Sequence, residues 1–246
     1  MTWFAPLLFW APTLFDQTAV RVLQQGFPQA QFVLVDVSSR EILGSRWSRL
    51  EQAIPVGSLV KPFTALAGRA GTYTCDPKHC WYPTGHGRIG LERAIADSCN
   101  SYFLQFAANV TNDDLRRVIT RYQLPSPASN NASTLIGIGD DWQWTPSQTT
   151  EAFAQLATDP EARAVRLGML ASAQSGTAKA LHGVALAKTG TAPCSHAGKA
   201  PGDGYVMMLY PARSPRYALL IQVHGVSGAV ASSTAAQMLD VLRNGK

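Results

Sequence analysis

Apolar residues recur every three or four positions in several stretches of the chain, which is the spacing of amphipathic helices. The first such stretch covers residues 14–26, where Gly26 ends the pattern, and the last covers 229–242. The interior helices predicted in the same way lie at 91–97, 101–109, 112–122, 146–157 and 161–173.

Runs of β-branched and other apolar residues predict strands in two separate parts of the chain. Residues 31–37 and 40–45 form two such runs separated by two serines, which indicates a hairpin. Three further strands are expected in the last third, at 183–190, 204–211 and 216–225. Between these groups, residues 54–68 predict a turn and an apolar helix, and 69–90 predict a loop rich in Gly, Pro and Cys.

The order of these elements predicts an α+β fold within the broad α/β class. The N-terminal hairpin can join the C-terminal strands in one antiparallel sheet of about five strands, flanked by helices. An all-helical lobe is then inserted into the chain. We expect a single domain over 1–246, with an α/β lobe from 14–68 and 160–246 and a helical lobe from 69–159. A cleft between two lobes is a common place for a small-molecule site.

The composition supports a folded protein with a substantial core. Hydrophobic residues make up 46 % of the 246 residues and charged residues 15 %, against about 25 % charged in a typical globular domain. This excludes intrinsic disorder. The net charge of +5 is not concentrated in any block, so no nucleic-acid surface is expected. The apolar residues 1–15 are too short for a membrane span of ~20 residues. An export signal, a membrane tether and a packed terminus remain open for this segment.

A first candidate motif, Ser58-Leu59-Val60-Lys61, stands at the start of the predicted apolar helix. A spacing of three residues places the serine and the lysine on the same helical face. Serine is a weak nucleophile that needs an adjacent base, and a desolvated lysine near a helix N-terminus can be neutral enough to serve. The ordinary alternative is a helix cap followed by a surface lysine.

A second motif, Ser98-Cys99-Asn100, lies at a junction between predicted helices. The hydroxyl can relay a proton, and the carboxamide can hold a substrate amide or a neighbouring lysine. Helix capping by Ser98 or Asn100 is the alternative.

The third motif, Lys188-Thr189-Gly190-Thr191, closes a predicted strand. Lys188 provides a cation and the two threonines provide hydroxyls for a substrate carboxylate. Gly190 allows a ligand to approach the backbone. The backbone N–H groups of Thr191 and Ser58 are candidate donors of an oxyanion hole.

The three motifs, in this order and on these elements, resemble those of the serine penicillin-recognising family, which includes β-lactamases and penicillin-binding proteins. The resemblance covers nearly the whole chain. Wider stretches are similar to the transpeptidase domains of high-molecular-weight penicillin-binding proteins; they lie at 55–67, 85–103, 144–157 and 184–192.

The resemblance implies a D,D-transpeptidase or D,D-carboxypeptidase acting on the D-Ala-D-Ala end of peptidoglycan stem peptides, in the bacterial cell envelope, periplasmic or extracytoplasmic. It implies Ser58 as the acylated nucleophile, Lys61 as its base and Ser98 as a proton shuttle. The implied substrate-binding residues are Asn100, Lys188, Thr189, Gly190 and Thr191. It implies β-lactams as covalent ligands and requires no metal or organic cofactor.

Two alternatives are a β-lactamase and a non-turnover β-lactam sensor or binding module. A class A β-lactamase would need a glutamate in a loop that activates the deacylating water, and residues 123–145 contain none. We therefore expect slow hydrolysis of penicillin.

The cysteines in the loop are the last candidates. A disulfide between Cys75 and Cys80 suits an exported protein, while free thiols and a zinc site are the alternatives. The other two cysteines, Cys99 and Cys194, are expected to be packed thiols. The zinc ligands considered are Cys75, His79, Cys80 and His86.

Overall fold

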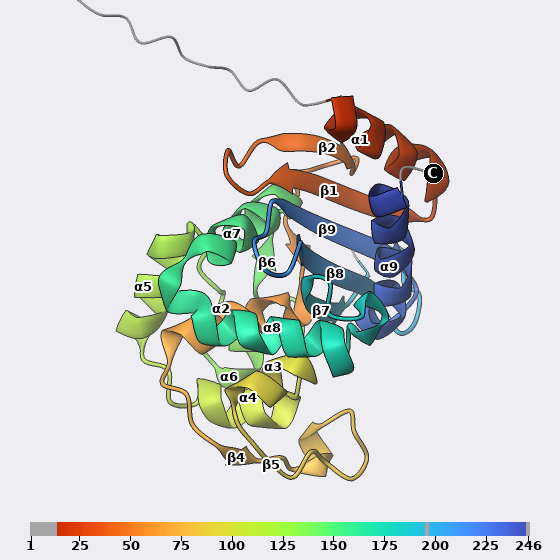
Figure 1. Cartoon of the computed structure of the whole chain (residues 1–246). Helices are drawn as coiled ribbons and strands as arrows, with labels where there is room; N and C mark the ends of the chain where they lie inside the picture. Colours follow the sequence, from red (N-terminus) through yellow and green to blue (C-terminus); the bar gives the residue numbers. More distant parts are fainter. Residues whose placement is uncertain (1–13, 195–196, 245–246) are drawn as a thin grey trace, which may run out of the picture.

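A five-stranded antiparallel sheet forms the centre of the structure, a computed structural model that describes residues 14–194 and 197–244. Its order is β2-β1-β9-β8-β7, so the N-terminal hairpin joins the C-terminal strands as the sequence predicts (Figure 1). The α+β fold class is confirmed. The strands are β1 (Ala30–Asp36), β2 (Ile42–Arg46), β7 (Leu186–Ala192), β8 (Asp203–Tyr210) and β9 (Tyr217–His224).

Strands β1, β8 and β9 are buried on both faces, which explains why they are nearly uninterrupted apolar runs. Successive residues of a strand point to opposite faces. In β1, Val33 and Val35 belong to one hydrophobic cluster, whereas Phe32 and Leu34 belong to another. The two faces of the sheet therefore carry two separate cores.

Helices cover the two faces. On one face α1 (Leu14–Gly26) and α9 (Gly228–Asn244) pack together, and on the other α7 (Pro146–Thr158) and α8 (Arg163–Ser175) contact the strands (Figure 1). The remaining helices are α2 (Lys61–Ala67), α3 (Leu91–Ala96), α4 (Asn100–Ala107), α5 (Asn112–Tyr122) and α6 (Ala132–Leu135). The division into lobes at residues 69 and 159 stays a prediction.

Short elements complete the chain. Strand β3 (Ile54–Pro55) pairs with β6 (Gln143–Trp144), and β4 (Tyr73–Thr74) pairs with β5 (Arg88–Ile89). The 3₁₀ turns are η1 (Gly57–Val60), η2 (Pro77–His79), η3 (Pro160–Ala162) and η4 (Lys179–Leu181). The segment 54–68, predicted as a turn and an apolar helix, therefore forms the strand β3, the turn η1 and the short helix α2.

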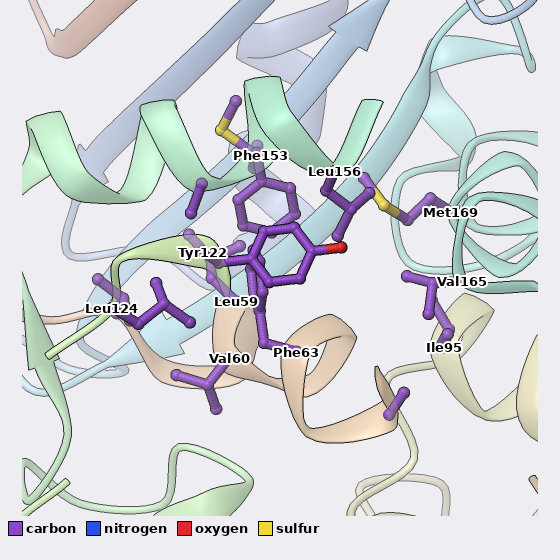
Figure 2. Close-up of a cluster of buried hydrophobic side chains, with 14 of the residues drawn as sticks. Leu59, Val60, Phe63, Ile95, Tyr122, Leu124, Phe153, Leu156, Val165 and Met169 are labelled. Atoms are coloured by element: carbon purple, nitrogen blue, oxygen red, sulfur yellow. The ribbon is translucent and has the colours of Figure 1, made fainter. Parts of the chain in front are cut away.

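Helix α2 is fixed by an aromatic cluster on its buried side (Figure 2). The Phe63 ring makes edge-to-face contacts with Tyr122, Trp144 and Phe153, at centroid distances of 5.1, 5.2 and 5.0 Å. Such pairs contribute about 0.5–1.5 kcal/mol each beyond burial. Phe63 stands two residues after Lys61, so this packing also holds the lysine in place.

Within the described residues, no helix combines the length and apolar character needed to cross a membrane. The apolar segment considered as a tether lies almost entirely in residues 1–13, outside the described part of the chain.

Candidate active site

The first motif begins in the turn η1 and ends at the start of α2. A 3₁₀ turn has three residues per turn, so positions three apart are aligned. The backbone N–H of Lys61 donates to the carbonyl of Ser58. Ser58 is half-buried and lines a cavity, whereas Lys61 is fully buried. The structure thus keeps the shared face that the spacing predicts, with a tighter turn than an α-helix.

Ser98 occupies a tight backbone position between α3 and α4. Its φ of 52° lies in the left-handed region, which is uncommon for a residue other than glycine. The Lys61 ammonium contacts the Ser98 carbonyl at 2.9 Å and the Ser98 hydroxyl at 3.4 Å. It also donates to Oδ1 of Asn100 at 2.5 Å. The second motif therefore surrounds the lysine of the first.

Strand β7, at the edge of the sheet, brings the third motif to the same place. The Lys188 ammonium lies 2.8 Å from the Ser98 hydroxyl and 2.7 Å from the Thr189 carbonyl. The Ser98 hydroxyl therefore lies between two lysines that come from different elements. The Thr191 hydroxyl accepts a hydrogen bond from the N–H of Gly228 at 2.9 Å, which leaves its own O–H for a ligand.

Two glycines let β7 approach η1 closely. A Cβ at Gly190 would lie 2.7 Å from the Val56 carbonyl oxygen, and one at Gly57 would lie 2.4 Å from the Thr191 carbonyl oxygen. Gly57 also has a φ of 55°, a conformation that other residues rarely adopt. The backbone beside Ser58 and the backbone of Thr191 are consequently in contact.

The three motifs meet around a cavity of about 350 Å³. The predicted residues that line it are Ser58, Ser98, Asn100, Thr189, Gly190 and Thr191. Neither Lys61 nor Lys188 is among the described lining residues; both contact Ser98 and lie behind the cavity wall.

Four further residues line the cavity, and no motif in the sequence marks them. Trp81, Thr177, Ser227 and Ala229 reach the cavity from separate loops and the start of α9. The Thr177 hydroxyl accepts a hydrogen bond from the Thr189 hydroxyl at 2.7 Å.

Burial changes the protonation of both lysines. Complete burial lowers the pKa of Lys61 from 10.5 to about 7, although nearby cysteine sulfurs act in the opposite direction. Burial, together with the adjacent charge of Lys61, lowers the pKa of Lys188 well below its usual range. Two ammonium groups beside one hydroxyl disfavour each other. Neutral Lys61 at physiological pH has the properties of a general base.

The expected disulfide between Cys75 and Cys80 is absent, because all four cysteines of the chain are free thiols. Cys75 and Cys80 instead converge with His86 and Cys99, and the four donor atoms all lie within 4.8 Å of one another. His79, which was considered as a zinc ligand, is exposed in η2 and outside this group. Among the described residues, Cys194, Asp203 and His224 form a second, three-membered group.

Solved structures of penicillin-binding proteins share the fold. Pseudomonas aeruginosa PBP2, solved in complex with WCK 5153, is 19 % identical with a TM-score of 0.73, over 91 % of this chain and 73 % of that one. Helicobacter pylori PBP2, solved with MreC, is 17 % identical with a TM-score of 0.76, over 94 % of this chain and 62 % of that one.

A third structure is penicillin-binding protein A from Mycobacterium tuberculosis, solved as a ceftriaxone acyl-enzyme. It is 19 % identical with a TM-score of 0.71, over 93 % of this chain and 78 % of that one. This chain is thus shorter than each of the three.

Sequence comparison identifies the family. No curated protein matches the chain significantly. The family model of the penicillin-binding protein transpeptidase domain matches residues 30–169, which is more than half of the chain and includes the first two motifs. The chain belongs to the family of penicillin-binding protein transpeptidase domains, serine acyl-transferases of peptidoglycan synthesis in the cell envelope.

Proposed function

We propose that the chain is a D,D-transpeptidase or D,D-carboxypeptidase that acts on the D-Ala-D-Ala end of a peptidoglycan stem peptide through a Ser58 acyl-enzyme. The observation that carries this proposal is the convergence at Ser98. Its hydroxyl lies 3.4 Å from the Lys61 ammonium nitrogen and 2.8 Å from that of Lys188, in the wall of the cavity that Ser58 lines.

The residues support acylation in the following way. Neutral Lys61 takes the Ser58 proton, and the Ser58 oxygen attacks the carbonyl carbon between the two D-alanines. Ser98 then passes a proton to the leaving amine, because its hydroxyl contacts the Lys61 nitrogen. The terminal D-alanine leaves, and an ester remains on Ser58. An acceptor amine (cross-linking) or water (carboxypeptidase) resolves this ester and returns the proton.

Binding of the substrate rests on β7. The backbone N–H groups of Ser58 and Thr191 are the proposed oxyanion donors, since the Thr191 nitrogen lies 3.2 Å from the Cβ position of Gly57, next to Ser58. The Thr189 and Thr191 hydroxyls face the substrate carboxylate across the cavity. Lys188 acts from behind them, and a bound carboxylate would favour its protonated form.

We further propose that β-lactams acylate Ser58 and leave it slowly. No described residue that lines the cavity carries a carboxylate, so none is placed to activate a deacylating water as a glutamate or aspartate would. This observation favours an inhibited transpeptidase over the alternative β-lactamase. A non-turnover sensor differs from the transpeptidase in lacking activity on stem peptides, and from the β-lactamase in keeping its acyl group. The proposed location is periplasmic or otherwise extracytoplasmic.

The test is intact-mass spectrometry after incubation with a fluorescent penicillin, followed by peptide mapping. We expect one adduct per chain, on the peptide that contains Ser58, and no adduct in Ser58→Ala. Ser48→Ala is the matched control, because Ser48 is an exposed serine away from the cavity. Adduct on a folded Ser58→Ala variant would disprove the nucleophile. Incubation with a D-Ala-D-Ala peptide, with and without an acceptor amine, then distinguishes cross-linking, hydrolysis and the sensor.

A further inference from the structure

Three thiols and one imidazole converge beside the second motif. They come from two separate segments: Cys75, Cys80 and His86 from the loop between β4 and β5, and Cys99 from the residue before α4. The Cys99 sulfur lies 3.4 Å from the Cys75 sulfur and 4.0 Å from the Cys80 sulfur. Nδ1 of His86 lies 3.6 Å from the Cys75 sulfur and 3.2 Å from the Cys80 sulfur.

These distances match the edges of a tetrahedron around a zinc ion. With Zn–S of about 2.3 Å and Zn–N of about 2.0–2.1 Å, tetrahedral geometry places two sulfurs about 3.8 Å apart, and sulfur and nitrogen about 3.6 Å apart. The four distances given above, from 3.2 to 4.0 Å, fall on both sides of these values. Three cysteines and one histidine are also a common ligand set of structural zinc sites.

The surroundings of His86 orient its ring for such a site. Nε2 of His86 lies 3.6 Å from a carboxylate oxygen of Asp97, which also pairs with Arg93 at 2.5 Å. A carboxylate on one ring nitrogen favours a proton there and leaves the other nitrogen free as a ligand. That other nitrogen, Nδ1, faces the thiols. The rings of Trp81 and Tyr82 pack against the same imidazole.

The loop that carries Cys75 and Cys80 has little apolar burial to hold it. Residues 76–84 are all exposed or half-exposed, and the side chains of Trp81 and Tyr82 are 56 % and 45 % exposed. It is flanked by the two-residue strands β4 and β5, and its turn η2 lies against α4 (Figure 1). A segment with so small a core needs another source of stability, and a structural metal is one such source.

We propose that Cys75, Cys80, His86 and Cys99 form a closed structural zinc site that holds the Ser98-Cys99-Asn100 motif in place. Zinc ligation converts the three thiols to thiolates and releases their protons. All four coordination positions come from the protein, so the ion has no open position for substrate.

The site reaches the catalytic cavity through two residues. Cys99 is flanked directly by Ser98 and Asn100, both of which contact Lys61. Trp81 lines the cavity and donates from its indole nitrogen to the carbonyl of Asp97 at 2.7 Å. Loss of the ion would release the turn that keeps Ser98 at its positive φ. This second part of the proposal, the link to catalysis, rests on the proposed function.

The metal is tested first, by elemental analysis of the full chain purified under reducing conditions without chelator. We expect one zinc per chain in the wild type and in Cys194→Ser, whose cysteine lies outside the site, and a loss of zinc in Cys75→Ser and Cys80→Ser. Because these two variants can misfold, a second measurement uses wild-type protein. After a chelator removes zinc, added Co²⁺ should give the visible absorption of a tetrahedral thiolate site. Asp97→Asn should weaken Co²⁺ binding by about 10–100-fold.

Protein that is zinc-free and gives no thiolate–cobalt spectrum would overturn the proposal, as would a disulfide joining two of the three cysteines in protein from the cell envelope. The link to catalysis has its own readouts. Removal of zinc should raise amide hydrogen exchange in residues 72–103 and slow penicillin acylation at least tenfold, and re-added zinc should reverse both. If amide exchange is unchanged after zinc removal, the positioning role is wrong, whether or not Ser58 is the nucleophile. If zinc-loaded protein is not labelled by penicillin, that result counts against the proposed function alone.

Discussion

The pH dependence of acylation tests the assignment of Lys61 as the base. With a pKa of about 7, the neutral fraction of Lys61 is roughly 10 % at pH 6, 50 % at pH 7 and 90 % at pH 8. The acylation rate should therefore rise about ninefold between pH 6 and pH 8 and then level off. A lysine with its ordinary pKa of 10.5 would instead give a rate that still rises about tenfold per unit at pH 9.

Stopped-flow measurement of acylation by a fluorescent penicillin, with protein in excess, gives this profile without interference from deacylation. The variant Asn100→Asp provides a second test of the pKa of Lys61, because Oδ1 of Asn100 lies 2.5 Å from the Lys61 nitrogen. A carboxylate there favours the ammonium form and should move the midpoint up by about 1–3 pH units. A rate that is flat from pH 5.5 to pH 9, or a midpoint that Asn100→Asp leaves in place, would refute the assignment.

Three further outcomes are expected. Phe63→Ala removes a fully buried ring from the cluster in Figure 2 and should lower the free energy of unfolding by about 3–5 kcal/mol in chemical denaturation, while the conservative Phe63→Leu should lose less. Gly190→Ala places a Cβ 2.7 Å from the Val56 carbonyl oxygen, so the backbone must shift, and the variant should lose at least tenfold in acylation rate and melt at a lower temperature; an unchanged rate would show that the close approach of β7 is not needed. Penicillin should leave Ser58 far more slowly than it binds, since general-base help to water is worth roughly 10²–10⁴-fold; rapid multiple turnover without accumulated adduct would indicate a β-lactamase.

Strands β1, β8 and β9 could be predicted because burial on both faces produces nearly uninterrupted apolar runs. The ends of the strands could not be predicted from these runs, because the flanking turns determine where a strand begins and ends. The predicted strand at 183–190 begins at Leu186 in the structure, after a turn in which Gly183 has a φ of 70°. The apolar helix predicted within 54–68 begins only at Lys61, for a related reason. Gly57 adopts a positive φ against Thr191, a contact between segments far apart in the sequence.

For the candidate active site, too, local spacing could be predicted from the sequence, whereas contacts between distant segments could not. The spacing of Ser58 and Lys61 predicts a shared face because local geometry sets it, whereas the joining of the other two motifs to this pair was implied only by the resemblance to a family. The cysteine group depends on two segments, the loop between β4 and β5 and the start of α4, that only the tertiary fold brings together. His79 is closer to Cys80 in sequence than Cys99 is, but the turn η2 exposes His79, while the N-terminal end of α4 carries Cys99 inward. Proximity along the chain therefore did not reveal that Cys99, and not His79, completes this group of side chains.

The two buried lysines are needed for the proposed activity but lower the stability of the folded protein. Each fully buried amine loses the hydration that it has in the unfolded chain, and side-chain hydrogen bonds return only part of that free energy. An apolar residue of similar volume, such as methionine at position 188, would avoid this loss and remove the cation behind the substrate carboxylate. Directed evolution of this domain for heat resistance alone should therefore accumulate substitutions at Lys188 and yield stable, inactive proteins. A stabilised enzyme requires selection on penicillin labelling in every round.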